Sequence, residues 1–254
     1  MTSALAAACG GVAAEPEAVP LLPEALMSHV PKDSRQVILV LSPAAESVPV
    51  RLWCLERVSE KGAWQTKMGP LPAVVGRNGL SWGRSDFTPD QAPKISPAWR
   101  IKHEGDGCSP AGVFALPFAF GSSDKTETAW LKLPYTQATP SLRGVDDPAS
   151  LFYNRVVDET KLPDGGKKDW NSSEDMLRTG DDAYKWGVFI GHNWPGTVRG
   201  KGARGSCIFL HLWKDEKSGT AGCTALAEDS LKKIMAWLDP AAKPMLVQTV
   251  ARLK

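Results

Sequence analysis

The stretch GSCIFLHLWKDEKSGTAGCTAL, residues 205–226, is the part of the 254-residue chain that says most about its fold. Its first half, SCIFLHLW (206–213), is a strongly apolar run that contains Ile, Phe and Trp. Such a run predicts a buried strand. A polar connection follows, and TAGC (220–223) then runs toward a predicted helix. One histidine and one cysteine are therefore expected on adjacent elements.

This pairing supplies what acyl transfer through a thiol needs. A thiolate is the nucleophile, and the pKa of a cysteine falls near a helix N-terminus or a protonated imidazole. His211 is placed to take the proton of Cys223 and return it to a leaving amine. Gly222 lets the backbone approach closely, so that nearby amides can stabilise an oxyanion. The stretch predicts a cysteine acyltransferase.

These residues resemble the signature of the YkuD-type L,D-transpeptidases, also called the ErfK/YbiS/YcfS/YnhG family. In that family a strand-ending His precedes Ser/Thr-x-Gly-Cys by a dozen or more residues. SPAGVF (109–114) resembles the family's Thr-Pro-x-Gly-x-Phe segment, and PMLV (244–247) resembles its closing strand. The resemblance covers about residues 36–254. It implies a mainly β, YkuD-like catalytic fold, a mixed β-sandwich with few helices, and no cofactor.

The resemblance also implies roles for single residues. Cys223 is the expected nucleophile and His211 the base, with the main-chain carbonyl of Leu212 orienting the imidazole. The amides of Gly222 and Cys223 are the expected oxyanion donors, and Thr220 is expected to make a structural hydrogen bond. The substrate side of the site is expected to consist of Thr220, Thr224, His192 and Asn193.

The implied activity is that of a peptidoglycan L,D-transpeptidase, which forms a Cys thioester at the bond between a diamino acid and a D-amino acid of a stem peptide. Two departures leave alternatives open. Ala221 replaces a common His, and Ala225 replaces an Arg or Asn, so a contact to the substrate carboxylate is missing or supplied from elsewhere. The Gly-Cys-x-Ala ending resembles the YafK-type branch. A hydrolytic L,D-carboxypeptidase or amidase is therefore the alternative, and a non-catalytic wall-binding module is a second one.

Apolar or alternating runs predict the remaining strands, and Gly112 in one of them suggests a bulge or close backbone approach. Residues 76–109 are interpreted as loop, and the polar stretch 155–182 as a long loop such as a lid. The predicted strands are 36–42, 48–58, 63–69 and 72–76 in a meander, then 110–120, 185–194, 206–213 and 245–250. One helix is predicted at about 228–238, from an apolar stripe that follows Glu228 and Asp229.

Composition limits the partners. Thirty basic and 28 acidic residues are interspersed, which disfavours nucleic acid. No apolar run of about eighteen residues predicts a membrane span, and we expect a monomer. Residues 1–34 are interpreted as an export or tether segment with a truncated signal peptide, and 35–254 as the catalytic domain, located in the periplasm or cell envelope. A lipoprotein-type site with a lipid anchor at Cys9 is the alternative.

Further predictions concern cysteines and charges. One disulfide among Cys54, Cys108 and Cys207 is compatible with export, without a predicted pairing. Cys207 and His211 lie roughly 13 Å apart on an extended strand, so we predict no metal site. The charged residues of 102–106, which precede the SPAGVF segment, are interpreted as surface charge, with a cleft-facing role as the alternative.

Overall fold

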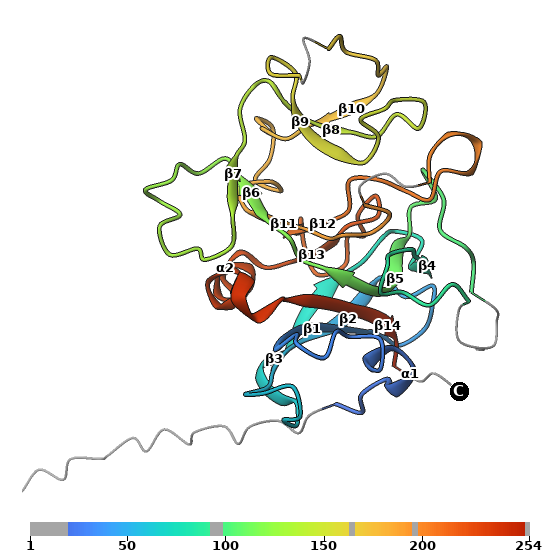
Figure 1. Cartoon of the computed structure of the whole chain (residues 1–254), viewed down its shortest axis with the longest axis vertical. Helices are drawn as coiled ribbons and strands as arrows, with labels where there is room; N and C mark the ends of the chain where they lie inside the picture. The colour runs from blue at the N-terminus through green and yellow to red at the C-terminus, as the bar shows by residue number, and fades with distance from the viewer. Residues whose placement is uncertain (1–19, 92–98, 163–165, 195–197, 252–254) are drawn as a thin grey trace, which may run out of the picture.

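The computed structural model describes residues 20–91, 99–162, 166–194 and 198–251, and within them the protein is mainly β (Figure 1). The predicted mixed β architecture is confirmed in its coarse form, since two α-helices accompany one eleven-stranded and one three-stranded sheet. The arrangement of a YkuD-like sandwich stays a prediction. Residues 1–19 of the predicted export segment (1–34), with Cys9, lie outside the described residues.

The strand order of the large sheet is β4 (Leu80–Trp82), β5 (Ser109–Ala115), β14 (Met245–Val250), β1 (Gln36–Ser42), β2 (Pro49–Glu56), β3 (Gln65–Val74), β13 (Thr224–Leu226), β12 (Phe209–Leu212), β11 (Gly187–Phe189), β6 (Ala119–Gly121) and β7 (Tyr135–Gln137). The sheet is mixed, because β1/β14, β12/β13, β4/β5 and β6/β7 pair in parallel and its other pairs are antiparallel.

The predicted meander is confirmed as β1, β2 and β3, which pair antiparallel in sequence order. The strand predicted at 36–42 has the bounds of β1, and every residue in it is buried, as expected for a central strand covered on both faces. Segments 63–69 and 72–76 were expected as separate strands, but β3 runs through both. The run 110–120 is instead divided between β5 and β6.

Gly112 confirms the expected close approach of the backbone. It has a φ of +144°, and a Cβ built on it would lie 2.5 Å from the Thr88 Oγ1 atom. The Thr88 hydroxyl donates to the Val113 carbonyl and accepts from the Val113 N–H, at 2.9 Å in each case. The region expected as loop, 76–109, contains Thr88, which makes these hydrogen bonds, and also strand β4.

The prediction of one long loop at 155–182 is wrong. Two of its segments, β9 (Arg155–Asp158) and β10 (Ser173–Asp175), flank β8 (Leu142–Val145) in the three-stranded sheet. This sheet lies at the end of the molecule opposite α1 (Glu24–Met27) (Figure 1). Strands β9 and β10 contain charged residues and are partly exposed, so they lack the apolar alternation by which strands are recognised.

The predicted helix is confirmed as α2 (Glu228–Trp237), whose buried residues are Leu231, Ile234 and Met235. Packing against the domain begins ahead of residue 35, because Leu26 in α1 is fully buried. Within the described ranges, no helix has the length and apolar character needed to cross a membrane. Cys54, Cys108, Cys207 and Cys223 are all free thiols.

Candidate active site

The pairing of β12 with β13 brings Cys223 and His211 together. The two strands are parallel and adjacent, with His211 opposite Ala225. Adjacent strands lie about 4.8 Å apart, and side chains two residues apart share one face. Cys223 directly precedes β13 and is two residues before Ala225. Its side chain is therefore on the same face of the sheet as the imidazole.

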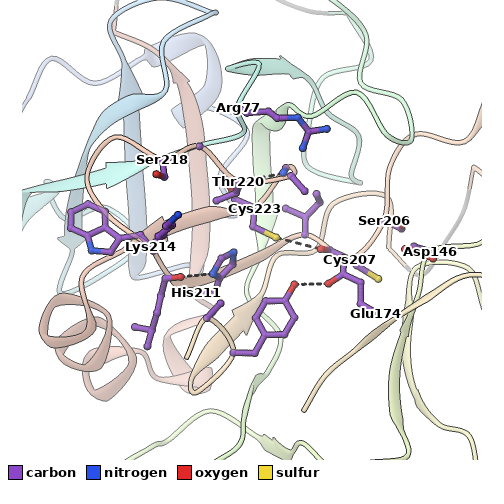
Figure 2. A pocket seen from close by; sticks show the side chains of 18 of the residues that line it. Arg77, Asp146, Glu174, Ser206, Cys207, His211, Lys214, Ser218, Thr220 and Cys223 are labelled. Atoms are coloured by element: carbon purple, nitrogen blue, oxygen red, sulfur yellow. Dashed lines mark hydrogen bonds between the residues drawn. The ribbon is translucent and has the colours of Figure 1, made fainter. Parts of the chain in front are cut away.

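The imidazole of His211 is held by the contact that the family resemblance implies. The Nδ1 atom lies 2.8 Å from the Leu212 carbonyl oxygen, which can only accept a hydrogen bond. This contact assigns the proton of the neutral ring to Nδ1 and leaves Nε2 as the basic nitrogen. The ring of Tyr184 packs edge-on against it, with centroids 5.3 Å apart. Figure 2 shows the second ring nitrogen on the side of Cys223.

The thiol of Cys223 makes its hydrogen bonds with the segment that enters β12. Its Sγ accepts from the Phe209 N–H at 3.3 Å. It donates to the Cys207 carbonyl at 3.5 Å (Figure 2). Among the described residues, neither bond of this thiol goes to His211. The thiol therefore has to turn toward the imidazole before it can transfer its proton. Catalytic hydrogen bonds are often incomplete in unliganded sites and tighten in the complex.

Burial keeps both groups neutral. It raises the pKa of the Cys223 thiol to about 12 and lowers the pKa of the His211 imidazole to about 4. The expectation of a thiolate stabilised by a helix N-terminus is wrong, because β13 separates Cys223 from α2. The pair is therefore a neutral thiol beside a neutral imidazole, so any attack by this thiol would have to be accompanied by transfer of its proton.

Two hydroxyl groups fix the turn that carries Cys223. Thr220 Oγ1 donates to the Cys223 carbonyl at 2.6 Å and accepts from the Gly222 N–H at 3.1 Å. Ser109 Oγ donates to the same carbonyl at 2.9 Å and accepts from the Gly76 N–H at 2.8 Å. The structural hydrogen bond expected of Thr220 is present. The role of Ser109 was not predicted, because it lies 114 residues from Cys223.

The same contacts change the expected oxyanion site. The Gly222 N–H already donates to Thr220, so it is not free to bind an oxyanion in this conformation. Within the described part of the chain, the Cys223 N–H has no comparable partner. The amide of Cys223 is therefore the remaining candidate of the two expected donors.

A cavity of about 440 Å³ opens over this pair. Strand β12 and the Cys223 turn form one wall, and the three-stranded sheet contributes Glu174 and the adjoining Asp146. The Glu174 carboxylate accepts a 2.5 Å hydrogen bond from the Tyr184 hydroxyl, and burial raises its pKa. Sequence reasoning missed Glu174 because its segment was expected to be a loop, and it missed both residues because no local pattern connects them to Cys223.

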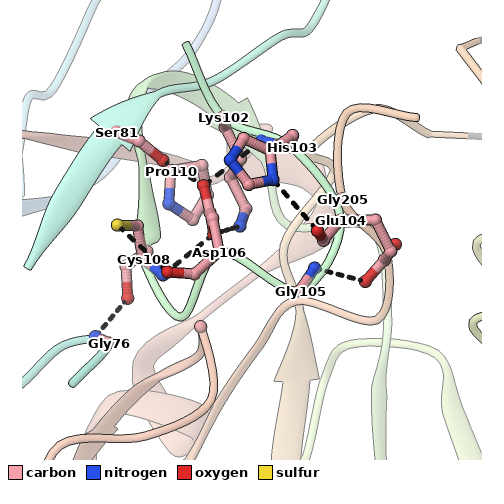
Figure 3. A network of polar contacts seen from close by, with 12 residues as sticks. Gly76, Ser81, Lys102, His103, Glu104, Gly105, Asp106, Cys108, Pro110 and Gly205 are labelled. Carbon is pink, nitrogen blue, oxygen red and sulfur yellow. Dashed lines mark hydrogen bonds and ion pairs between the residues drawn. The ribbon is translucent and has the colours of Figure 1, made fainter. Parts of the chain in front are cut away.

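The interpretation of the charged residues of 102–106 as surface charge is wrong for Lys102 and Asp106, whose side chains are buried. Lys102 is only 3% exposed and forms a 2.7 Å ion pair with Asp106 (Figure 3). Glu104 accepts hydrogen bonds from the hydroxyls of Tyr153 and Ser206. Lys102 and Glu104 line the same cavity as Cys223. The alternative of a cleft-facing role is therefore correct for Lys102 and Glu104, whereas Asp106 does not line this cavity.

Three predicted substrate contacts are not brought to the cavity. His192 is fully buried, its Nδ1 accepts from the Arg84 N–H at 3.2 Å, and its Nε2 lies 2.7 Å from the Arg204 carbonyl. Asn193 donates to the carbonyls of Val198 and Gly205. These side chains connect loops and are sealed from solvent, so a substrate-binding role for them is wrong.

Thr224 is the third. It follows Cys223 directly, and the alternation of strand side chains turns it to the opposite face. It is fully buried there, and its hydroxyl donates to the Gln248 side-chain oxygen at 2.8 Å. The prediction that Thr224 binds substrate is wrong for this reason.

Within the described ranges, no group of three or more His, Cys, Asp or Glu side chains is placed to hold a metal ion. The chemistry available is that of a thiol, an imidazole and a set of charged side chains around one cavity. No protein-family model and no curated protein matches the chain.

Proposed function

We propose that this protein is a cysteine acyltransferase that acts on peptidoglycan stem peptides as an L,D-transpeptidase. The observation that carries the proposal is the shared face of Cys223 and His211 on adjacent parallel strands, at the wall of one cavity. The Leu212 carbonyl holds the imidazole in the tautomer that a base requires. A purely structural role for His211 would not explain why it shares a cavity with the thiol of Cys223.

In the first half-reaction, Cys223 Sγ attacks the carbonyl carbon of the diamino acid while its proton passes to His211 Nε2. A C–S bond forms and the carbonyl oxygen becomes an oxyanion, which the Cys223 N–H stabilises. The oxyanion then collapses, the C–N bond to the D-amino acid breaks, and His211 returns the proton to the leaving amine. A thioester and a free D-amino acid result.

In the second half-reaction, the amine of another stem peptide attacks the thioester. A C–N bond forms, the C–S bond breaks, and the amine proton returns through His211 to Cys223. Water in place of the amine gives hydrolysis by the same path. The neutral pair is compatible with both half-reactions, because His211 holds the proton only during each transfer. Before and after each half-reaction the proton is on the thiol or on the amine.

The substrate class is supported by the resemblance of residues 205–226 to the YkuD signature and by the charges of the cavity. Lys102 and Arg77 supply positive charge there, and Glu104 and Glu174 supply carboxylates. A stem peptide carries both amino and carboxylate groups, so it complements this lining. Peptidoglycan lies outside the cytoplasmic membrane, and location in the periplasm or cell envelope is part of the proposal.

The test is a product analysis with tetrapeptide muropeptides and mass spectrometry. We expect crosslinked dimers from the unmodified protein and none from Cys223→Ala. The matched control is Cys54→Ala, because Cys54 is a fully buried thiol in β2 and does not line the cavity. Tripeptide without dimers would replace transfer by hydrolysis. Unchanged substrate, with no Cys223 adduct after treatment with a carbapenem, would refute the proposal in favour of a binding module.

A further inference from the structure

Lys102 is a buried cation with unused hydrogen-bonding capacity. Its side chain is 3% exposed, and an ammonium group has three N–H donors. Within the described residues, its Nζ has one hydrogen-bond partner, Asp106 Oδ1 at 2.7 Å. Buried charges are normally paired and fully hydrogen-bonded. The remaining donors of Lys102 therefore indicate a partner that the chain itself does not provide.

The ammonium lies between two glycines at the wall of the cavity. A Cβ built on Gly205 would lie 3.3 Å from Lys102 Nζ, and one built on Gly222 would lie 3.8 Å from it. Gly222 is the residue before the nucleophile. Lys102 and Cys223 line the same cavity, and the charge of Lys102 acts to lower the pKa of that thiol against the larger effect of burial. The cation is thus a neighbour of the reacting sulfur.

Asp106 does not need Lys102 for its own hydrogen bonding. Its carboxylate also accepts from Ser81 Oγ at 2.9 Å, from the Cys108 N–H at 2.9 Å and from the His103 N–H at 3.2 Å (Figure 3). These contacts fix the carboxylate on the loop before β5. Asp106 in turn holds the lysine, so that its ammonium stays at the cavity wall.

Other cations at the cavity are less suited to bind a charged group deeply. Arg178 forms two hydrogen bonds with Asp181, at 2.8 and 2.6 Å. Arg77 and Lys214 are exposed and hydrated at the rim. Ala225, where the resembling family often has Arg or Asn, is fully buried and has no polar side chain. Of these cations, Lys102 is the one that is buried from water and keeps hydrogen-bond donors that a ligand could use.

We propose that Lys102 binds the α-carboxylate of the terminal D-amino acid of the stem peptide and so positions the preceding carbonyl at Cys223. This inference rests on the proposed function. In the scissile segment the carboxylate belongs to the residue next to the attacked carbonyl, and successive Cα atoms are only about 3.8 Å apart. A cation near the Cys223 turn matches that short separation. An ammonium is a point charge that binds a carboxylate without requiring bidentate geometry.

The test separates binding from turnover. Binding is measured by calorimetry on the Cys223→Ala protein, with a tetrapeptide that ends in D-alanine and with the same peptide as its C-terminal amide. We expect the acid to bind about 10- to 100-fold more tightly than the amide, the effect of one charge-assisted hydrogen-bonded contact. This comparison leaves Lys102 in place, so it does not depend on whether a Lys102 variant folds.

Lys102→Met in the same background should remove that preference, weakening the acid about 10- to 100-fold and the amide by less than about threefold. Lys102→Arg should retain part of it. The matched control is Lys67→Met, which removes a half-exposed lysine paired with Glu56 outside the cavity and should change neither affinity. Equal affinity for acid and amide, or equal loss of both in Lys102→Met, would overturn the inference. Carboxylate-selective binding without turnover by the unmodified protein would refute the transpeptidase proposal alone.

Discussion

Two histidines on neighbouring strands show what separates a candidate base from a structural residue. His192 follows β11 and His211 lies in β12, and both are buried, at 0% and 8% exposure. Burial lowers the pKa of both imidazoles, to about 3 and about 4. They differ in their hydrogen bonds. Both nitrogens of His192 form hydrogen bonds with backbone groups. In His211 one nitrogen is bonded to the Leu212 carbonyl, and the residue lines a cavity with the other nitrogen unbonded among the described residues.

Burial and a shifted pKa are therefore insufficient to identify a base in this protein. A fully bonded imidazole rigidifies the loops that it connects, and it has no free lone pair for a substrate proton. An imidazole with one bonded nitrogen at a cavity wall is held in a fixed orientation and keeps a lone pair that can accept a proton. The comparison predicts that the two histidines contribute to different measurable quantities, activity for one and stability for the other.

Replacing His211 should have the largest effect on activity. His211→Gln removes the base while keeping a side chain that can hydrogen-bond, and we expect kcat/KM for muropeptide turnover to fall about 10²- to 10⁴-fold, the usual contribution of acid–base catalysis. The free energy of unfolding should change little. Turnover by mass spectrometry and unfolding in urea measure the two quantities. A variant with near-normal turnover would remove His211 from the mechanism.

Replacing His192 should have the opposite effect. His192→Leu removes the hydrogen-bond partner of the Arg84 N–H and of the Arg204 carbonyl, both of which are shielded from solvent in part. We expect a loss of about 2–4 kcal/mol in the free energy of unfolding, because each unsatisfied group costs about 1–3 kcal/mol. Turnover per folded molecule should stay within a few-fold of normal. A selective loss of turnover with normal stability would show that the comparison assigns the two roles wrongly.

The pH dependence follows from the lowered pKa values. An imidazole acts as a base only when unprotonated, so kcat/KM should fall as pH drops through about 4 rather than through the ordinary value of about 6.5. Both histidines bind a proton more readily in the unfolded chain. The free energy of unfolding should therefore be highest above about pH 6.5 and fall as the pH drops, by roughly 3 kcal/mol for His211 by about pH 4, with the loss from His192 continuing to about pH 3. A rate profile with its acid limb near 6.5 would contradict the buried, neutral His211.

The smallest expected effect compares two threonines that flank Cys223. Thr220→Val removes both hydrogen bonds that fix the nucleophile turn, and we expect kcat/KM to fall about tenfold. Thr224→Val is the matched control, because its hydroxyl bonds Gln248 on the other face. It should cost about 1 kcal/mol of stability and leave kcat/KM unchanged. Equal losses of activity in both variants would indicate that the turn is not specifically positioned by Thr220.

Local patterns predicted the strongly apolar elements well and the polar ones poorly. Strands at 36–42 and 245–250 were predicted with the bounds of β1 and β14, and the helix within one residue. Apolar periodicity reports burial directly, and these elements are buried. The strands β9 and β10 contain charged, partly exposed residues and were expected as loop. Their place in the fold depends on pairing with β8, which no local pattern encodes.

The sequence alone determined which atoms are chemically competent. A thiol in a Gly-Cys turn and a histidine in an apolar strand are properties of a short segment, so residues 205–226 sufficed to predict the pair. Only the tertiary structure decided what surrounds them. Lys102 and Glu174 reach the cavity from segments far apart in the chain, and Thr224 turns away because strand side chains alternate. Burial, charge pairing and the free nitrogen of His211 are set by long-range packing, which is why they could not be predicted from the segment itself.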